Sequence, residues 1–87
     1  MCSSDLLGYH GAMVYNYAGM AYGETGDGER AVKAYEKAVQ LDPHYAEAYL
    51  NLALHYRKRG ELAKARQHYQ KTCDLSVELC RKYSSKF

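Results

Sequence analysis

Residues 12–45 read AMVYNYAGMAYGETGDGERAVKAYEKAVQLDPHY, and residues 46–79 read AEAYLNLALHYRKRGELAKARQHYQKTCDLSVEL. These segments follow one another directly, and sliding the sequence by 34 positions superposes the first on the second with eight identical residues. The identities are Ala12 and Ala46, Tyr15 and Tyr49, Tyr22 and Tyr56, Gly26 and Gly60, Ala31 and Ala65, Tyr35 and Tyr69, Lys37 and Lys71, Leu41 and Leu75. Self-similarity at a period of this length indicates an array of structural repeats.

Each segment contains the pattern of two amphipathic helices separated by a turn. In the first half, large and small residues recur at three- and four-residue spacing and therefore share one helical face. These sets are Tyr15, Ala18, Gly19 and Tyr22 in the first segment, and Tyr49, Leu52, Ala53 and Tyr56 in the second. Gly26 and Gly60 interrupt the pattern, and each precedes an acidic residue suited to a helix N-terminus. The sequence predicts an all-α fold with helices near residues 12–25, 28–41, 44–58 and 61–82.

Small residues are expected where paired helices approach most closely. Gly19, Ala31, Ala53 and Ala65 supply such positions, and the Tyr rings are expected to fill the space beside them. The seam between the helices is therefore predicted to be a packing of small against large side chains.

Two junctions determine where the later helices begin and end. Asp42 and Pro43 have the pattern of an N-cap followed by proline at the first helical position, which predicts that the third helix starts there. Val77 stands where the first segment has proline, so nothing stops the last helix and its apolar spacing continues to Tyr83. The predicted organisation is an N-terminal flank or cap at 1–11, repeats at 12–45 and 46–79, and an extension of the last helix or a cap at 80–87.

The composition indicates one small domain. The chain of 87 residues has ten Tyr, no Trp and one Pro, and its net charge is +2. Residues 1–45 hold three basic and six acidic side chains (−3), whereas residues 46–87 hold nine basic and four acidic ones (+5). We interpret this division as solvated surface; the alternatives are a basic face for an acidic partner, or attraction between the two ends of the chain.

Cys2, Cys73 and Cys80 form no Cys-x-x-Cys pair. On one continuous helix Cys73 and Cys80 would be roughly 10 Å apart, which exceeds the reach of a disulfide. We therefore expect reduced thiols and a cytoplasmic location. As an alternative, the sequence Met-Cys-Ser-Ser-Asp resembles a processed lipoprotein placed behind a start Met, which would hold the protein at a membrane surface through a lipid on Cys2. No apolar stretch is long enough to span a bilayer.

Residue types used in catalysis are present without the spacing that catalysis needs. The histidines at positions 10, 44, 55 and 68 never lie three or four residues apart, and no carboxylate completes a ligand set, so no metal is expected. No base accompanies a cysteine, and the glycines of the first turn lack the lysine and hydroxyl of a phosphate loop. We therefore expect neither an enzyme nor a bound cofactor.

The densest basic run, Arg57-Lys58-Arg59, is interpreted as cations placed favourably at a helix C-terminus. Binding to nucleic acid is not expected, because base stacking needs exposed aromatic rings and these tyrosines are mostly assigned to packing.

The spacing of the large and small residues resembles that of the tetratricopeptide-repeat family over residues 12–79. The matching positions are Tyr15, Ala18, Gly19, Tyr22, Ala31, Tyr35, Ala38 and Pro43 in the first repeat, and Tyr49, Leu52, Ala53, Tyr56, Ala65 and Tyr69 in the second. The departures are Tyr for the usual Trp, Ala53 for Gly, Thr72 for Ala and Val77 for Pro. The resemblance implies an α-α superhelix (solenoid) of two helix-turn-helix repeats, with a long or capping C-terminal helix.

In that family the first helix of each repeat lines a concave groove that receives a peptide, so the resemblance implies an adaptor or scaffold that binds another protein. Carried over to this sequence, the groove lining is Met13, Asn16, Tyr17 and Met20 with Leu50, Asn51, Leu54 and Arg57. These residues lie opposite the Tyr/Ala face and are expected to be free of the repeat packing. Chaperone-binding members clamp a peptide carboxylate with Lys and Asn, of which only Asn51 matches, so that binding mode is rejected.

The alternative is a structural module, either a homodimer or a segment of a longer array, whose groove is filled by itself. Two repeats bury few residues, and the last helix is expected to leave apolar side chains without partners in one chain: Leu75, Val77, Leu79 and Cys80. We expect a closed two-fold dimer through this helix. The contrary expectation is a monomer in which residues 80–87 fold back as a cap.

Overall fold

The computed structural model describes the backbone of residues 2–87 and the side chains of residues 11–87. In this part of the chain all regular structure is helical: α1 (Cys2–Glu24), α2 (Gly28–Leu41), α3 (Ala46–Lys58), α4 (Leu62–Leu75), α5 (Val77–Lys82) and the 3₁₀ helix η1 (Ser84–Lys86). The prediction of an all-α fold built from helix-turn-helix pairs is confirmed. The chain divides into two compact units, residues 1–45 and residues 46–87, and each is described by itself.

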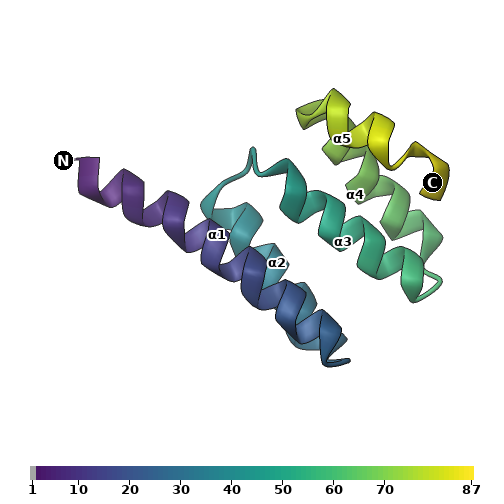
Figure 1. The fold of residues 1–87 in the computed structure, drawn as a ribbon, viewed down its shortest axis with the longest axis horizontal. Helices are drawn as coiled ribbons and strands as arrows, with labels where there is room; N and C mark the ends of the chain where they lie inside the picture. Colours follow the sequence, from purple (N-terminus) through teal and green to yellow (C-terminus); the bar gives the residue numbers. More distant parts are fainter. Residues whose placement is uncertain (1) are drawn as a thin grey trace. The chain divides into compact units, whose positions relative to one another are not determined.

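The first unit is an antiparallel pair in which α2 returns along α1 (Figure 1). The two helices are in close contact at Gly19, where a Cβ atom would lie 2.6 Å from Cε1 of Tyr35. Ala31 and Ala38 on α2 are completely buried. Tyr35, which lies between them in the sequence, is also buried. Burial raises the pKa of Tyr35, and the nearby charge of Glu24 raises it further. Tyr35 is therefore a neutral residue of the core, and its ring packs against Gly19 of α1, which has no side chain.

The second unit repeats this arrangement with α3 and α4, while α5 lies against α4 (Figure 1). Ala53 and Ala65 are buried, as the seam prediction requires, and Leu52 is buried with them. Thr72, which stands where the first repeat has Ala38, is also buried, and its hydroxyl donates to the carbonyl of His68 at 3.0 Å. This intrahelical hydrogen bond satisfies the hydroxyl, so the polar residue is accommodated in the core.

The turns within the two repeats have the same geometry. Gly26 and Gly60 have φ angles of 87° and 84°, a left-handed conformation that residues with a side chain rarely adopt. In each turn the next amide donates back to a carbonyl of the preceding helix: Asp27 to Tyr22 at 2.8 Å, and Glu61 to Tyr56 at 2.9 Å. These bonds satisfy carbonyls at the ends of α1 and α3.

The acidic residues after these glycines act differently at the next helix. The side chain of Asp27 accepts from the amide of Arg30 at 3.2 Å and so caps α2. Glu61 makes no such capping bond and instead forms ion pairs at 3.4 Å with Arg59 and with Lys64. Both are suited to a helix N-terminus, as predicted, but only Asp27 caps through a hydrogen bond.

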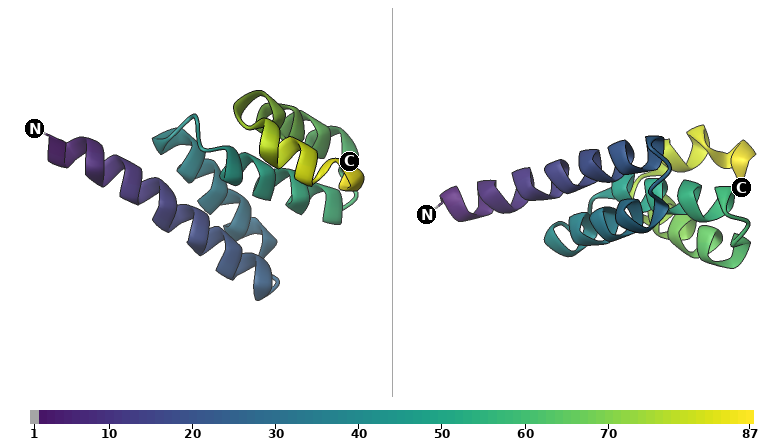
Figure 2. Two further views of the ribbon diagram at one scale, coloured as in Figure 1. Left: turned by 45° about the horizontal axis from the view of Figure 1, so that its top comes forward. Right: turned by 90° about the horizontal axis from the view of Figure 1, so that it is seen from below.

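Two predicted helix starts are wrong. The first helix begins at Cys2 rather than near residue 12, and its N-terminal part extends beyond α2 (Figure 2). Asp42 is not an N-cap: it ends α2, its carboxylate accepts from the amide of His44 at 3.1 Å, and its carbonyl accepts from the amide of Tyr45 at 3.1 Å. These bonds form a turn around Pro43, and α3 therefore starts only at Ala46.

The predicted single helix over 61–82 is also wrong, because the chain breaks at Ser76. Ser76 has an extended backbone (φ −147°, ψ 106°), and its hydroxyl accepts from the amide of Leu79 to cap α5. A hydrogen-bonded cap at Ser76 thus ends α4, although the next residue, Val77, stands where the first repeat has proline. The same kind of local competition makes Ser a good capping residue and a poor interior one.

The break overturns the expectation of reduced thiols for two of the cysteines. Cys73 and Cys80 form a disulfide, with their Cα atoms 4.6 Å apart. The estimate of roughly 10 Å applied to a continuous helix, whereas the corner at Ser76 folds α5 back toward α4. Tyr69 on α4 donates its hydroxyl to the carbonyl of Cys80, and its ring stacks on Phe87 at 4.2 Å. No residue of α5 is fully buried, and the bridge and the contacts of Tyr69 join the C-terminal segment to α4.

Gly19→Ala is expected to destabilise the protein by about 1–3 kcal/mol, because the new methyl group would overlap the buried ring of Tyr35. Gly23→Ala on the same helix is the matched control, since a Cβ there meets no atom within 4 Å. Chemical denaturation followed by circular dichroism measures both variants. Equal stability of the two would show that the Gly19 contact does not limit the packing.

Cys73→Ser is expected to lower the stability by about 2 kcal/mol, the value expected for a loop of this length if the bridge acts on chain entropy. For a domain of this size such a loss lowers Tm by roughly 10 °C. A reducing agent should lower the Tm of the wild type to that of the variant and leave the variant unchanged. Cys2→Ser retains both bridging sulfurs and should melt as the wild type does.

Candidate functional site

The predicted groove residues of α1 include two large exposed side chains. Tyr17 is 59% exposed and Met20 is 42% exposed, while Met13 is half-buried. Val14, which the sequence analysis did not select, is also strongly exposed. Val14, Tyr17 and Met20 follow one another at three-residue spacing, so they form a strip along one side of α1, here named the α1 strip. That spacing was visible in the sequence and would have identified Val14.

Asn16 does not belong to an open surface. It is only 1% exposed, and its side-chain amide donates to the hydroxyl of Tyr45 at 3.3 Å. The bond ties the end of the first unit to the middle of α1. A buried amide of this kind is expected to have such partners, so the expectation that Asn16 is free of packing is not met.

The four groove residues predicted on α3 also differ in how deeply they are buried. Leu50 is 4% exposed and is a core residue, which the expectation of a free face did not foresee. Asn51 and Leu54 are half-buried, and Arg57 is exposed. Open surface among these four is therefore concentrated toward the C-terminal end of α3.

Cations gather at that end of α3. Arg57 and Lys58 occupy its last turn together with His55, and Arg59 follows directly. The negative end of the helix dipole favours positive charge at this place. The interpretation of the basic run as a helix C-terminus is confirmed by these positions.

His55 is the titratable group whose environment is most unusual in this region. Its Nε2 atom is buried and has no hydrogen-bond partner among the described residues. Burial lowers the pKa of His55 below its ordinary value, the positive charge of Arg59 lowers it further, and the charge of Glu61 opposes the shift. The neutral imidazole is therefore the favoured form in the folded protein.

Within the described side chains, no three of His, Cys, Asp and Glu gather closely enough to hold a metal ion. No helix in the described part of the chain combines the length and the apolar character needed to cross a bilayer. The lipid-anchor alternative concerns Cys2, whose side chain lies outside the described residues.

The lowered pKa of His55 predicts a loss of stability in mild acid. Below about pH 6.5 the unfolded chain takes up a proton that folded His55 binds only at lower pH, so stability falls as the pH passes from 6.5 toward the folded pKa. Thermal melts at about pH 7.5 and about pH 5.5 should show a smaller acid-induced decrease in Tm for His55→Leu than for the wild type. His44→Gln, which removes an exposed imidazole, is the control. An equal decrease in wild type and His55→Leu would contradict the prediction.

Comparison with known proteins identifies the repeat. A profile described as tetratricopeptide repeat matches residues 18–76, which include the C-terminal end of α1 and all of α2, α3 and α4. The uncharacterized protein ycf37 of Pyropia yezoensis is 38% identical over 66 residues, covering 76% of this chain and 37% of that protein. An uncharacterized protein of Methanocaldococcus jannaschii is 33% identical over 75 residues, covering 85% of this chain and 87% of that protein.

A third relative has a functional name. The Photosystem I assembly protein Ycf3 of Prochlorococcus marinus is 39% identical over 54 residues, covering 62% of this chain and 31% of that protein. This chain therefore spans about a third of the length of ycf37 and of Ycf3. The profile match, the 34-residue period and the two helix pairs with left-handed glycine turns all agree: the chain belongs to the tetratricopeptide-repeat family.

Proposed function

We propose that this chain is an adaptor that binds a peptide segment of another protein along the first helix of each repeat, α1 and α3. The observation that carries the proposal is the α1 strip, in which Val14, Tyr17 and Met20 expose apolar surface. Repeats of this family generally mediate contacts between proteins and are generally non-catalytic. One relative is named for the assembly of a photosystem, which accords with a role in holding other polypeptides.

The α1 strip is suited to binding because the helix pair does not need it for its own packing. Tyr17 lies two residues from Gly19, so the two positions are about 200° apart around the helix axis. Gly19 faces Tyr35, and Tyr17 therefore points away from the α1–α2 seam. Tyr is frequently a dominant residue in protein interfaces, and the flexible side chain of Met20 adapts to different partner shapes.

On α3 the proposed contacts come from the residues that keep accessible surface. Leu54 offers a half-buried apolar side chain, and Arg57 offers an exposed cation. Asn51, on the same helix, is half-buried. Asn16 and Leu50, which are buried, are assigned to supporting the helices that carry the other side chains.

A second candidate function is self-association, in which another copy of the chain is the partner. Val77 favours it, because this residue of α5 is 67% exposed and apolar. Light scattering after gel filtration separates the candidates: a molar mass near 9.9 kDa at high protein concentration is that of the monomer and excludes the homodimer.

Tyr17→Ala is expected to weaken binding of a partner peptide by at least about fivefold, because truncating an interface Tyr commonly removes more than 1 kcal/mol. Leu54→Glu should weaken it as well, by placing a charge on the apolar lining. The protein serves as bait, captured polypeptides are identified by mass spectrometry, and the binding segment is then titrated by calorimetry against each variant.

Leu62→Glu is the matched control, because Leu62 is exposed at the start of α4, away from the proposed contacts. Circular dichroism verifies that each variant is folded. If Tyr17→Ala and Leu54→Glu bind as tightly as Leu62→Glu, the groove assignment is wrong.

A further inference from the structure

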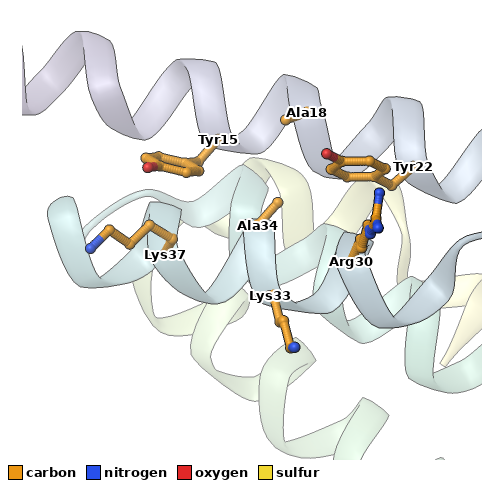
Figure 3. A pocket seen from close by; sticks show the side chains of 7 residues that line it. All are labelled: Tyr15, Ala18, Tyr22, Arg30, Lys33, Ala34 and Lys37. Atoms are coloured by element: carbon orange, nitrogen blue, oxygen red, sulfur yellow. The ribbon is translucent and has the colours of Figure 1, made fainter.

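The first unit contains a pocket of about 370 Å³ between α1 and α2, and the α1 strip has no part in it. Its residues come from one face of each helix: Tyr15, Ala18 and Tyr22 from α1, with Arg30, Lys33, Ala34 and Lys37 from α2. Figure 3 shows the two Tyr rings spaced along α1, with Ala34 opposite the gap between them. This volume lies at the lower end of the range of ligand pockets in proteins.

The pocket exists because the two repeats differ at two positions. Ala18 corresponds to Leu52 in the second repeat, and Ala34 corresponds to His68. Leu52 is completely buried, and the ring of His68 lies 5.2 Å from the ring of Tyr56, the counterpart of Tyr22. Large side chains thus occupy in the second unit the space that two methyl groups leave open in the first.

The charges around the pocket are segregated. Arg30, Lys33 and Lys37 are all the lysines and arginines of residues 1–45, and all three line the pocket. None of the acidic residues whose side chains are described in this half, at positions 11–45, lines the pocket, although the half as a whole has a charge of −3. Arg30 lies over the ring of Tyr22 at 5.9 Å and pairs with Asp27 at 3.4 Å in an exposed position. The pocket therefore has methyl groups, aromatic walls and a positive rim in which Arg30 is paired with Asp27.

We propose that this pocket binds an acidic peptide segment, inserting an aliphatic side chain between Tyr15 and Tyr22 and placing flanking carboxylates near Arg30 and Lys37. Charge complementarity selects this occupant: an acidic chain meets the three cations, and its apolar residue covers Ala18 and Ala34. Arg30 and Lys37 are seven residues apart on one helix, which is roughly 10 Å. An extended peptide spans that distance with residues three apart.

On α1 the pocket faces away from Tyr17, since Tyr15 and Tyr17 differ by about 200° around the helix, whereas Val14 of the α1 strip lies one turn from Ala18 and borders the pocket side. The pocket is therefore a second docking surface, and its test does not depend on the outcome of the groove experiments. A single-stranded nucleic acid also combines stacking with cations. It is therefore included in the test as a competing occupant.

The test uses the full chain and a fluorescent synthetic peptide in which two leucines are flanked on each side by glutamates. Fluorescence anisotropy should show binding that weakens as salt rises from about 0.05 to about 0.5 M, because the rim charges are exposed and screened. A peptide with serines for the leucines should bind more weakly, and one with lysines for the glutamates should not bind. Equal binding of the three peptides overturns the proposal.

Variants then locate the site. Ala18→Leu copies the residue of the second repeat, fills the pocket, and should weaken the peptide by about tenfold, the loss that corresponds to roughly 1.4 kcal/mol. Lys37→Glu should weaken it by about fivefold or more, since an attraction becomes a repulsion. Lys71→Glu is the matched control: it makes the same charge change at the corresponding position of the second repeat, where the space is filled. Tyr17→Ala should leave this peptide's affinity unchanged, which separates the pocket from the groove.

Three outcomes overturn the proposal. If the Ala18→Leu variant binds the acidic peptide as tightly as the wild type does, the pocket is not the binding site. A cooperative thermal melt at or above the wild-type Tm verifies that this variant is folded. Tighter binding of a labelled oligouridine than of the acidic peptide, lost in Ala18→Leu, assigns the pocket to nucleic acid. A concentration-dependent molar mass that Ala18→Leu abolishes assigns it to a second copy of the chain.

Discussion

The contact between Gly19 and the ring of Tyr35 is the constraint on which the first helix pair depends. A side chain of any size at position 19 would overlap the ring, so the distance between α1 and α2 is set by one missing Cβ atom. The flanking alanines of α2 are buried because the helices are already this close. The second unit has Ala53 at the corresponding position, buried without any exposed surface, so this pair of helices accommodates one methyl group where the first pair accommodates none. Dense packing of this kind leaves few substitutions neutral.

The parts of the fold that follow from short-range chemistry were predictable from the sequence. Gly26 and Gly60 both indicated turns, and both have the left-handed backbone that makes glycine necessary. The small residues of the seam were predictable for the same reason, since their spacing has the period of a helix. The end of α4 was not predictable in this way, because Ser76 competes with the helix through a hydrogen bond of its own side chain, and the outcome of that competition depends on where α5 packs.

The candidate site was predicted less completely than the fold, and burial explains the difference. Helical periodicity places Asn16 on the same broad side of α1 as Tyr17, yet Asn16 is buried through a bond to Tyr45, a residue 29 positions away. A hydrogen bond between residues so far apart in the sequence cannot be predicted from the spacing of residues within one helix. Conversely, the pocket beside Ala18 escaped prediction because the seam was expected to bury Tyr15, which is partly exposed. Comparing the two repeats residue by residue, Ala18 with Leu52, is the signal that reveals it.

The disulfide at the C-terminus has a consequence for the course of the chain. A straight helix through residues 73–80 would hold the two Cα atoms roughly 10 Å apart, whereas the bridge holds them at 4.6 Å. A bonded pair of sulfurs and an unbroken helix therefore exclude one another. The bridge makes the corner at Ser76 obligatory in the oxidised protein. In the reduced protein the corner depends only on noncovalent contacts, the cap at Ser76 and the contacts of Tyr69 with Cys80 and Phe87 among them.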